Sequence, residues 1–246
     1  MTRVACAVVV LMLVSAAGAI ADPCHIDATG GTIEVLTDES TVRMADEVVK
    51  VVISRERCDV EALFTFVNEG PEQDVTMGFP EMGNHGLPGS PPEAEWYQEF
   101  GDGWGHGVPV SGLQFQVDDE LVSVTVRYRE AAPPPESRDF DWVARCLRWH
   151  VGTMHMAPGQ TRTVRITYWQ KHGVTANNGP EWFHYALFTG KSWKGTIGDI
   201  RVEIEATDSV QVGGEGWQDG KRTWHFTDWD GEPDAIHVSY RVPKGE

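Results

Sequence analysis

Basic residues are scarce in this sequence, which has 20 Lys and Arg against 37 Asp and Glu and a formal charge of −17. Nucleic acids and anionic lipid surfaces bind through positive charge, so this balance argues against both as partners. Long apolar runs are also scarce, because after the N-terminal stretch no segment is long and apolar enough to span a membrane. Disorder is excluded in turn, since 10 Trp, 9 Phe and 5 Tyr are too many aromatic residues for a chain that never packs.

Sequence motifs that name a reaction are absent as well. Neither H-E-x-x-H nor C-x-x-C occurs, so a zinc site would need ligands from distant segments. Gly190-Lys191 resembles the end of a phosphate-binding loop, but Tyr185 stands where that loop requires its first glycine. Ser90 lies in Gly-Ser-Pro and not in the G-x-S-x-G turn of hydrolases. We therefore expect no cofactor and favour a protein that is not an enzyme.

The single apolar run predicts export. Arg3 precedes a nearly unbroken apolar stretch, and Ala19-Ile20-Ala21 is the small-x-small pattern that signal peptidase accepts. We expect cleavage of residues 1–21, which would leave a mature chain of residues 22–246 with a formal charge of −18. This mature chain is expected to lie in the periplasm or outside the cell, without membrane insertion.

Cysteine is sparse, with Cys24, Cys58 and Cys146 remaining after that cleavage. An exported protein can keep a disulfide, and three thiols allow one internal pair. Cys24 with Cys58 is the favoured pair because both flank the first predicted strands, but the sequence leaves the other pairings open.

Alternation of apolar and polar residues dominates the rest of the chain. Val122, Val124, Val126 and Tyr128, for example, alternate with polar residues, which is the period of a half-buried strand. Many short strands separated by turn residues predict an all-β fold, an antiparallel β-sandwich. The predicted strands cover residues 32–36, 48–54, 60–67, 75–79, 113–117, 122–128, 147–151, 164–168, 200–204, 224–227 and 236–242.

Two segments depart from the strand pattern after residue 130. Residues 131–135 form an Ala-Pro run, so two abutting β-subdomains divided near 131–136 are an alternative to one domain. Residues 137–147 carry apolar side chains at helical spacing and predict the only helix.

One long loop, residues 82–112, contains eight glycines and four prolines. Loops of this length in a compact domain are typically functional or disordered, and its aromatic residues favour order. We take Trp96, Tyr97 and Trp104 as candidate binding residues, because burial is not guaranteed in a glycine-rich loop.

Aromatic and imidazole side chains within the predicted strands have simpler interpretations. Trp149 and Trp193 lie in or beside strands, as does Trp169, and such residues commonly fill sandwich cores. His237 alternates with Ile236 and Val238 and is expected to face solvent.

A metal-binding role depends on a short cluster. Methionine, cysteine and imidazole ligands suit copper, but a strand here would place neighbouring residues on opposite faces, and the spacing matches no metal signature. We expect no metal site, and we retain as weak candidates His150, Met154, His155 and Met156.

Three blocks of sequence share a pattern with known proteins. The first has Gly30-Gly31 before an acidic strand, then F-x-N and D-V-T strands ending at Phe79-Pro80. The second, residues 149–168, has a Trp-containing strand, a Pro-Gly turn and V-x-I-x-Y. The third, residues 185–198, contains the pattern T-G-x-x-W-x-G-x-I-G from Thr189 to Gly198. In these blocks the chain resembles a family of secreted bacterial proteins catalogued as a domain of unknown function. The resemblance implies a secreted β-rich domain, transfers no catalytic residue and does not extend to the 82–112 loop.

Together these observations favour an exported, non-enzymatic domain that binds a protein or glycan of the bacterial envelope or has a structural role there. One alternative is a hydrolase acting on polysaccharide with carboxylates of the 82–112 loop, and another is a periplasmic metal-binding protein. A glycosidase needs two carboxylates at a set separation, and the loop supplies Glu93, Glu95, Glu99 and Asp102.

Overall fold

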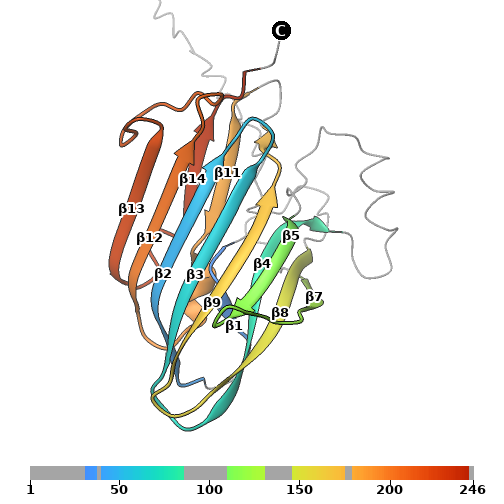
Figure 1. The fold of residues 1–246 in the computed structure, drawn as a ribbon, viewed down its shortest axis with the longest axis vertical. Coiled ribbons are helices and arrows are strands. Elements are labelled where there is room, and N and C mark those ends of the chain that lie inside the picture. The colour runs from blue at the N-terminus through green and yellow to red at the C-terminus, as the bar shows by residue number, and fades with distance from the viewer. Residues whose placement is uncertain (1–30, 38–39, 86–109, 131–145, 175–178, 244–246) are drawn as a thin grey trace, which may run out of the picture.

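The computed structural model describes residues 31–37, 40–85, 110–130, 146–174 and 179–243, which form three β-sheets (Figure 1). The large sheet has seven strands in the order β13 (Lys221–Trp229), β12 (Ile197–Ala206), β2 (Val42–Ile53), β3 (Cys58–Asn68), β9 (Thr161–Gln170), β5 (Val110–Val117) and β6 (Glu120–Leu121). The β4 sheet has the order β1 (Glu34–Val35), β4 (Gln73–His85), β8 (Cys146–Met156) and β7 (Thr125–Glu130). The β11 sheet has the order β10 (Gly173–Val174), β11 (Glu181–Ala186) and β14 (Ala235–Tyr240).

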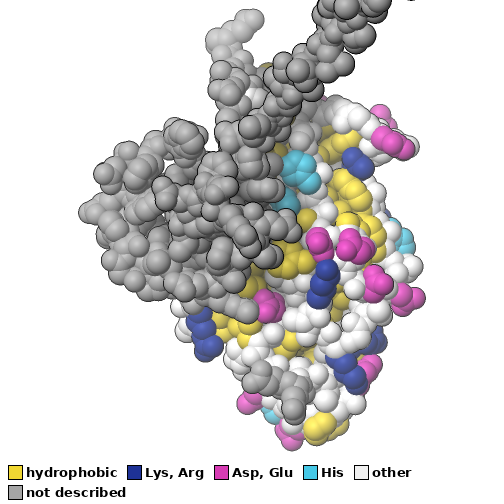
Figure 2. All heavy atoms as spheres, turned by 180° about the vertical axis from the view of Figure 1, so that it is seen from behind, with side chains coloured by type: hydrophobic (Ala, Val, Ile, Leu, Met, Phe, Trp, Pro, Cys, Tyr) yellow, Lys and Arg dark blue, Asp and Glu magenta, His cyan; other side chains and the backbone are white. Residues whose placement is uncertain are grey.

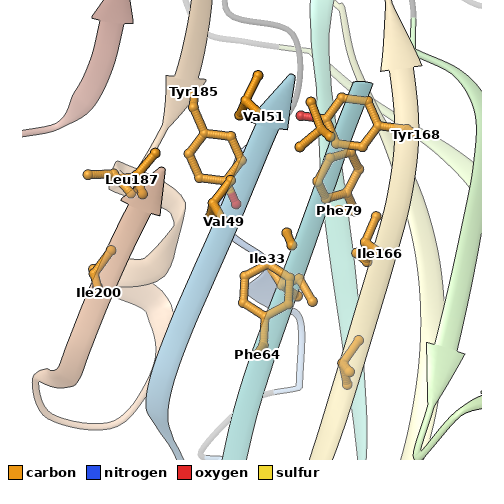
Figure 3. Close-up of a cluster of buried hydrophobic side chains, with 14 of the residues drawn as sticks. Ile33, Val49, Val51, Phe64, Phe79, Ile166, Tyr168, Tyr185, Leu187 and Ile200 are labelled. Atoms are coloured by element: carbon orange, nitrogen blue, oxygen red, sulfur yellow. The ribbon is translucent and has the colours of Figure 1, made fainter. Parts of the chain in front are cut away.

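The two smaller sheets pack side by side on one face of the large sheet. From the β4 sheet, the ring of Phe79 lies 5.1 Å from that of Tyr168 on β9. From the β11 sheet, the Tyr185 hydroxyl reaches Glu47 on β2. Figure 3 shows the resulting core, where side chains of all three sheets meet in one apolar cluster.

This architecture confirms the predicted all-β sandwich, and its basis is visible in single strands. In β3 every second residue is buried, from Cys58 through Phe64 to Asn68, so one face enters the core and the other faces outward. One pairing differs from the antiparallel expectation, because β2 and β12 run parallel. Both the large sheet and the β4 sheet combine strands from before and after residues 131–136.

Local patterns failed at a few places. Strand β11 was not predicted, because Trp182 and Phe183 are adjacent and both buried, which hides the alternation. The predicted helix is wrong at Cys146 and Leu147, which begin β8, and residues 137–145 lie outside the described residues. Val126 is expected on the buried face of its half-buried strand, but it is 47% exposed.

The only helix assigned in the described residues is the short 3-10 turn η2 (Phe188–Ser192). No helix in this part of the chain has the length and apolarity needed to cross a membrane. Trp149 and Trp193 are buried as expected, while Trp169 is only partly buried, with the Arg57 guanidinium 5.2 Å above its ring.

Residues 31–35, the bridging segment, join the two smaller sheets. Gly31 forms a parallel bridge with Ala186 at the end of β11, and β1 pairs with β4 three residues later. Gly31 cannot carry a side chain, because a Cβ there would lie 2.5 Å from the Ala186 carbonyl oxygen. The segment therefore closes a gap at which buried backbone groups would otherwise lack partners.

The third block of the family resemblance holds this segment in place. Thr189 Oγ1 donates to Thr32 O, and Trp193 Nε1 donates to Ile33 O at 2.6 Å. Ser192 Oγ accepts from Val35 N at 2.8 Å. The T-G-x-x-W pattern thus has an architectural explanation.

A buried carboxyl group ties the bridging segment to the large sheet. Glu47 on β2 is fully buried and accepts from Tyr185 Oη at 2.8 Å and from Thr32 Oγ1 at 2.9 Å. Burial raises the pKa of Glu47 to about 7, and the hydrogen bonds from Tyr185 and Thr32 only partly oppose this. Glu47 therefore connects strands of two sheets with the bridging segment.

This raised pKa predicts a pH-dependent stability. Between the ordinary carboxyl pKa of 4.5 and the raised pKa of about 7, the native state keeps the Glu47 proton while the unfolded state releases it. The free energy of unfolding should therefore fall as pH rises through this window, by about 3 kcal/mol, and stay level above it. Glu47→Gln should lack this contribution, so the stability of the variant relative to the native protein should rise with pH. Urea unfolding at pH values from 4.5 to 8 measures the difference, and a pH-independent difference would contradict the assignment.

Candidate binding site

The candidate binding residues Trp96, Tyr97 and Trp104 lie outside the described residues, between the end of β4 and the start of β5. Their role therefore stays a prediction. The same holds for the disulfide, because Cys24 lies in the undescribed residues 1–30, and Cys58 is a free thiol in the described part of the chain.

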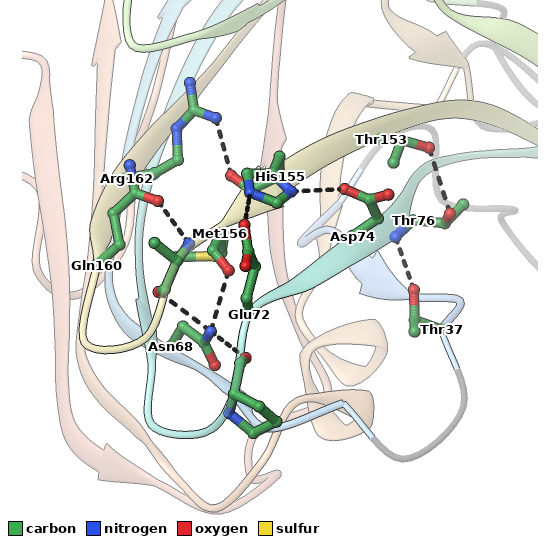
Figure 4. A network of polar contacts seen from close by, with 12 residues as sticks. Thr37, Asn68, Glu72, Asp74, Thr76, Thr153, His155, Met156, Gln160 and Arg162 are labelled. Carbon is green, nitrogen blue, oxygen red and sulfur yellow. Dashed lines mark hydrogen bonds and ion pairs between the residues drawn. The ribbon is translucent and has the colours of Figure 1, made fainter.

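The four metal candidates share β8 but not one face. Met154 and Met156 are buried in the core, and His150 on the same face donates from Nε2 to Glu81 Oε2 at 2.7 Å. His155 points outward, where its two ring nitrogens donate to Asp74 and Glu72 at 2.9 Å each (Figure 4). The hydrogen bonds to Asp74 and then Glu72 raise the pKa of His155. Among the described residues, no group of three or more His, Cys, Asp and Glu side chains could hold a metal ion.

The structure instead gathers polar side chains inside the sandwich, at the end where β3 begins and β9 ends. We call this set the interior polar cluster: Cys58, Glu81, His150, Gln170, His172 and Tyr240. The strand register explains the grouping, because Gln170 pairs with both Cys58 on β3 and Val110 on β5, and directly paired residues face the same side.

One half of the cluster joins the large sheet to the β11 sheet. Cys58 Sγ lies 3.3 Å from Tyr240 Oη, which in turn lies 2.9 Å from His172 Nδ1. His172 Nε2 donates to Arg55 O at 3.2 Å, and Tyr240 Oη donates to Trp182 O at 3.2 Å. The side chains of Tyr240 and His172 are therefore held by polar contacts with each other and with backbone carbonyl groups of both sheets' neighbouring segments.

The other half joins the large sheet to the β4 sheet. Glu81 is fully buried on β4, and its Oε1 accepts from Val110 N at 3.1 Å. Its second oxygen accepts from His150. The carboxylate thus pairs an edge backbone group of β5 and orients an imidazole at the same time.

Between the two halves lies a side chain whose polar atoms are unpaired. Gln170 is fully buried, and neither its Nε2 nor its Oε1 has a hydrogen-bond partner in the part of the chain that the structure describes. Tyr168, two residues earlier on the same face of β9, is likewise buried with an unpaired hydroxyl within that part of the chain. Buried polar groups in proteins nearly always have a partner, so the unpaired atoms of Gln170 and Tyr168 call for an explanation.

Asn68 is a buried amide whose side-chain hydrogen bonds all stabilise the fold. Its Nδ2 donates to Pro71 O at 2.7 Å and to Met156 O and Ala157 O at 3.2 Å each (Figure 4). Its Oδ1 accepts from Gly70 N at 3.0 Å. Asn68, from the F-x-N block of the resemblance, therefore fastens two turns, and the contrast sets Gln170 apart.

The chemistry of the cluster suits binding better than nucleophilic catalysis. Burial raises the pKa of Cys58 to about 12, so the group is a thiol and not a reactive thiolate at neutral pH. Burial also raises the pKa of Tyr240 far above its ordinary value. What remains is a set of hydrogen-bond donors and acceptors beside the Glu81–His150 pair.

Sequence reasoning missed Gln170, although a signal was present. Val164, Ile166 and Tyr168 define the inward face of β9, and Gln170 continues the same alternation. A glutamine at an inward position of an otherwise apolar strand face was the available clue. Glu81 had no comparable signal, because its partners come from β5 and β8.

No family model and no curated protein matches this chain, and no named family contradicts the resemblance described above. Among solved structures, the fold is similar to a crystal structure from Legionella pneumophila described as a putative nutrient binding protein. That match has a TM-score of 0.58 and 17% identity, and it covers 88% of this chain and 71% of the other.

An M1 zinc metallopeptidase from Deinococcus radiodurans matches with a TM-score of 0.35 and 12% identity, over 76% of this chain and 39% of the peptidase. A TM-score this low carries no inference about fold or activity. At 17% identity, the Legionella pneumophila match establishes the shared fold and leaves the function to be argued from the residues.

The two buried amides predict opposite responses to the same kind of substitution. Asn68→Leu should destabilise the protein by about 3 kcal/mol or more, because it leaves several buried or partly buried backbone groups without their hydrogen-bond partner. Gln170→Leu should change stability little or raise it by about 1 kcal/mol, since it replaces unpaired polar atoms with a similar apolar shape. Denaturant unfolding of both variants measures the contrast. A large loss for Gln170→Leu would mean that this amide is satisfied in the free protein.

Proposed function

We propose that this chain is an exported, non-catalytic binding domain of the bacterial envelope that takes its ligand at the interior polar cluster. The observation that carries the proposal is Gln170, a fully buried amide with both polar atoms unpaired among the described residues. An unpaired buried polar group costs about 1–3 kcal/mol, and a ligand that pairs it recovers this free energy on binding.

The cluster also indicates the kind of ligand. A primary amide presents an N–H donor beside its carbonyl acceptor and has a second N–H donor, so its best partner offers the complementary donor and acceptor on adjacent atoms. Amides, amino acids and the neighbouring hydroxyls of a sugar all do so. The Tyr168 hydroxyl on the same strand face adds a further donor or acceptor. A small polar molecule or the end of a glycan fits this chemistry.

Further support comes from what surrounds the cluster. The raised pKa of the Cys58 thiol argues against nucleophilic turnover. The Legionella pneumophila protein of similar fold is described as a putative nutrient binding protein, which is compatible with a binding role for this chain. Export and an envelope location rest on the signal-peptide pattern of residues 1–21.

A ligand screen with matched variants tests the site. Sugars, amino acids and short peptides are screened by thermal shift against the native protein, Gln170→Leu and Gln114→Leu. Gln114 is the control because it is exposed on β5, and the same substitution there leaves the interior unchanged. A ligand at about 100 times its Kd should raise the Tm by several degrees in the native protein and in the control. No shift is expected in Gln170→Leu, and an equal shift in that variant would remove Gln170 from the site.

The 82–112 loop gives a separate test for a macromolecular partner. Trp96→Ala combined with Trp104→Ala should abolish retention on envelope polysaccharide without lowering the Tm, since aromatic rings form good sugar-binding surfaces. Retention is measured by pull-down, with Trp169→Ala on the large sheet as the control. Unchanged retention would exclude the loop as the contact, and release of reducing sugar would favour the alternative of a hydrolase.

A further inference from the structure

Two histidines lie directly opposite each other on the outer face of the β11 sheet. His184 of β11 and His237 of β14 are paired in register, whereas Phe183 and Val238, their neighbours in sequence, point into the core. Figure 2 views the molecule from this side and shows histidine side chains on the surface near hydrophobic ones. This face is separate from the interior polar cluster.

The register brings the two imidazoles close together. Leu187 N donates to Asp234 O, just beyond the paired segment. Hydrogen-bonded and non-hydrogen-bonded pairs alternate along antiparallel strands, so counting back makes His184–His237 a non-hydrogen-bonded pair, the type with the closer side chains. The ring centroids are 5.9 Å apart with an interplanar angle of 70°.

Both rings are available as ligands. His184 has no hydrogen-bond partner within the described ranges, and burial lowers its pKa to about 4, with His237 adding a smaller effect. Partial burial also lowers the pKa of His237. Both imidazoles are therefore neutral at pH 7, and a metal ion need not displace protons to bind them.

Neighbouring residues hold His237 in position. Its Nε2 lies 3.2 Å from Ser239 Oγ, which fixes one ring nitrogen and leaves the other open. The Trp182 ring stacks against the imidazole at a centroid distance of 6.3 Å and an angle of 28°. The other histidines considered above differ, because His150 is engaged by Glu81 and His155 by Asp74 and Glu72.

We propose that His184 and His237 form a binding site for a divalent transition-metal ion such as Zn²⁺ or Cu²⁺. One ring nitrogen from each histidine binds the ion, and water fills the remaining positions, since no third His, Cys, Asp or Glu among the described residues completes the set. Imidazole nitrogen suits Zn²⁺, Cu²⁺ and Ni²⁺, and this donor set disfavours Mg²⁺ and Ca²⁺, which prefer oxygen.

Zinc titration of the full chain tests the site. Binding is measured by isothermal titration calorimetry, and histidine ring ¹⁵N shifts identify the nitrogens that bind Zn²⁺. The ring signals of His184 and His237 should shift together, and the backbone signals of the flanking residues in β11 and β14 should follow. Mg²⁺ at the same concentration should leave all these signals unchanged.

Matched variants decide whether the pair acts as a chelate. His184→Ala and His237→Ala should each weaken Zn²⁺ binding by roughly tenfold or more, because the second ligand then no longer acts at high effective concentration. His225→Ala is the control, since His225 is exposed on β13 and its Nε2 lies 2.6 Å from Asp199 Oδ2. The affinity of this variant for Zn²⁺ should equal that of the native protein.

Two results would overturn the proposal. Shifts confined to other groups, such as His25 or the cysteine thiols, would place the zinc elsewhere. Unchanged affinity in His237→Ala would show that the pair does not bind jointly. His237 is exposed on its strand, so this variant should fold and remains decisive even if His184→Ala does not.

Discussion

The fold depends on joining two small sheets into one layer above the large sheet. Each small sheet alone would leave an edge facing the other inside the protein, and unpaired backbone groups there would be costly. Residues 31–35 remove this problem by pairing with Ala186 at one end and with β4 at the other. The side chains around the bridging segment follow from the same need. Thr189, Ser192 and Trp193 bind its backbone, and its Thr32 hydroxyl donates to Glu47 in the large sheet.

The buried polar side chains inside the sandwich therefore fall into two groups. Some have all or most of their hydrogen bonds within the fold, and others have none. Glu47 and Asn68 are buried, but each has several hydrogen bonds that join separate segments, so their retention is explained by architecture. Gln170 is equally buried, but its side chain makes no hydrogen bond within the described part of the chain. A buried polar side chain without hydrogen bonds is a stronger indication of a binding role than one whose hydrogen bonds join parts of the fold. The same reasoning explains why the resemblance blocks inform the architecture and leave the ligand open.

The sequence predicted strands wherever one face of a strand meets the core and the other meets solvent. It failed at β11, because Trp182 is covered on the outer face and Phe183 on the inner face, so alternation disappears. It could not predict the parallel pairing of β2 with β12, because no local turn connects strands so distant in the chain. Site residues were equally hard to predict when their partners come from distant segments of the chain. His237 was correctly expected to face outward, but its partner His184 lies on the unpredicted strand, and Glu81 finds Val110 and His150 only in three dimensions.

The interior polar cluster and the histidine pair touch the same residue, Trp182. Its carbonyl accepts from Tyr240 on the inner side, and its ring lies against His237 on the outer side. Spatial contact alone does not couple two sites, because coupling requires an element with two arrangements that both sites bias. The β11–β14 ladder is continuous from Glu181–Tyr240 to Ala186–Ala235 without a register shift, so the structure gives no sign of a second arrangement of this ladder. We therefore regard the two sites as energetically independent, each set by its own face of the β11 sheet.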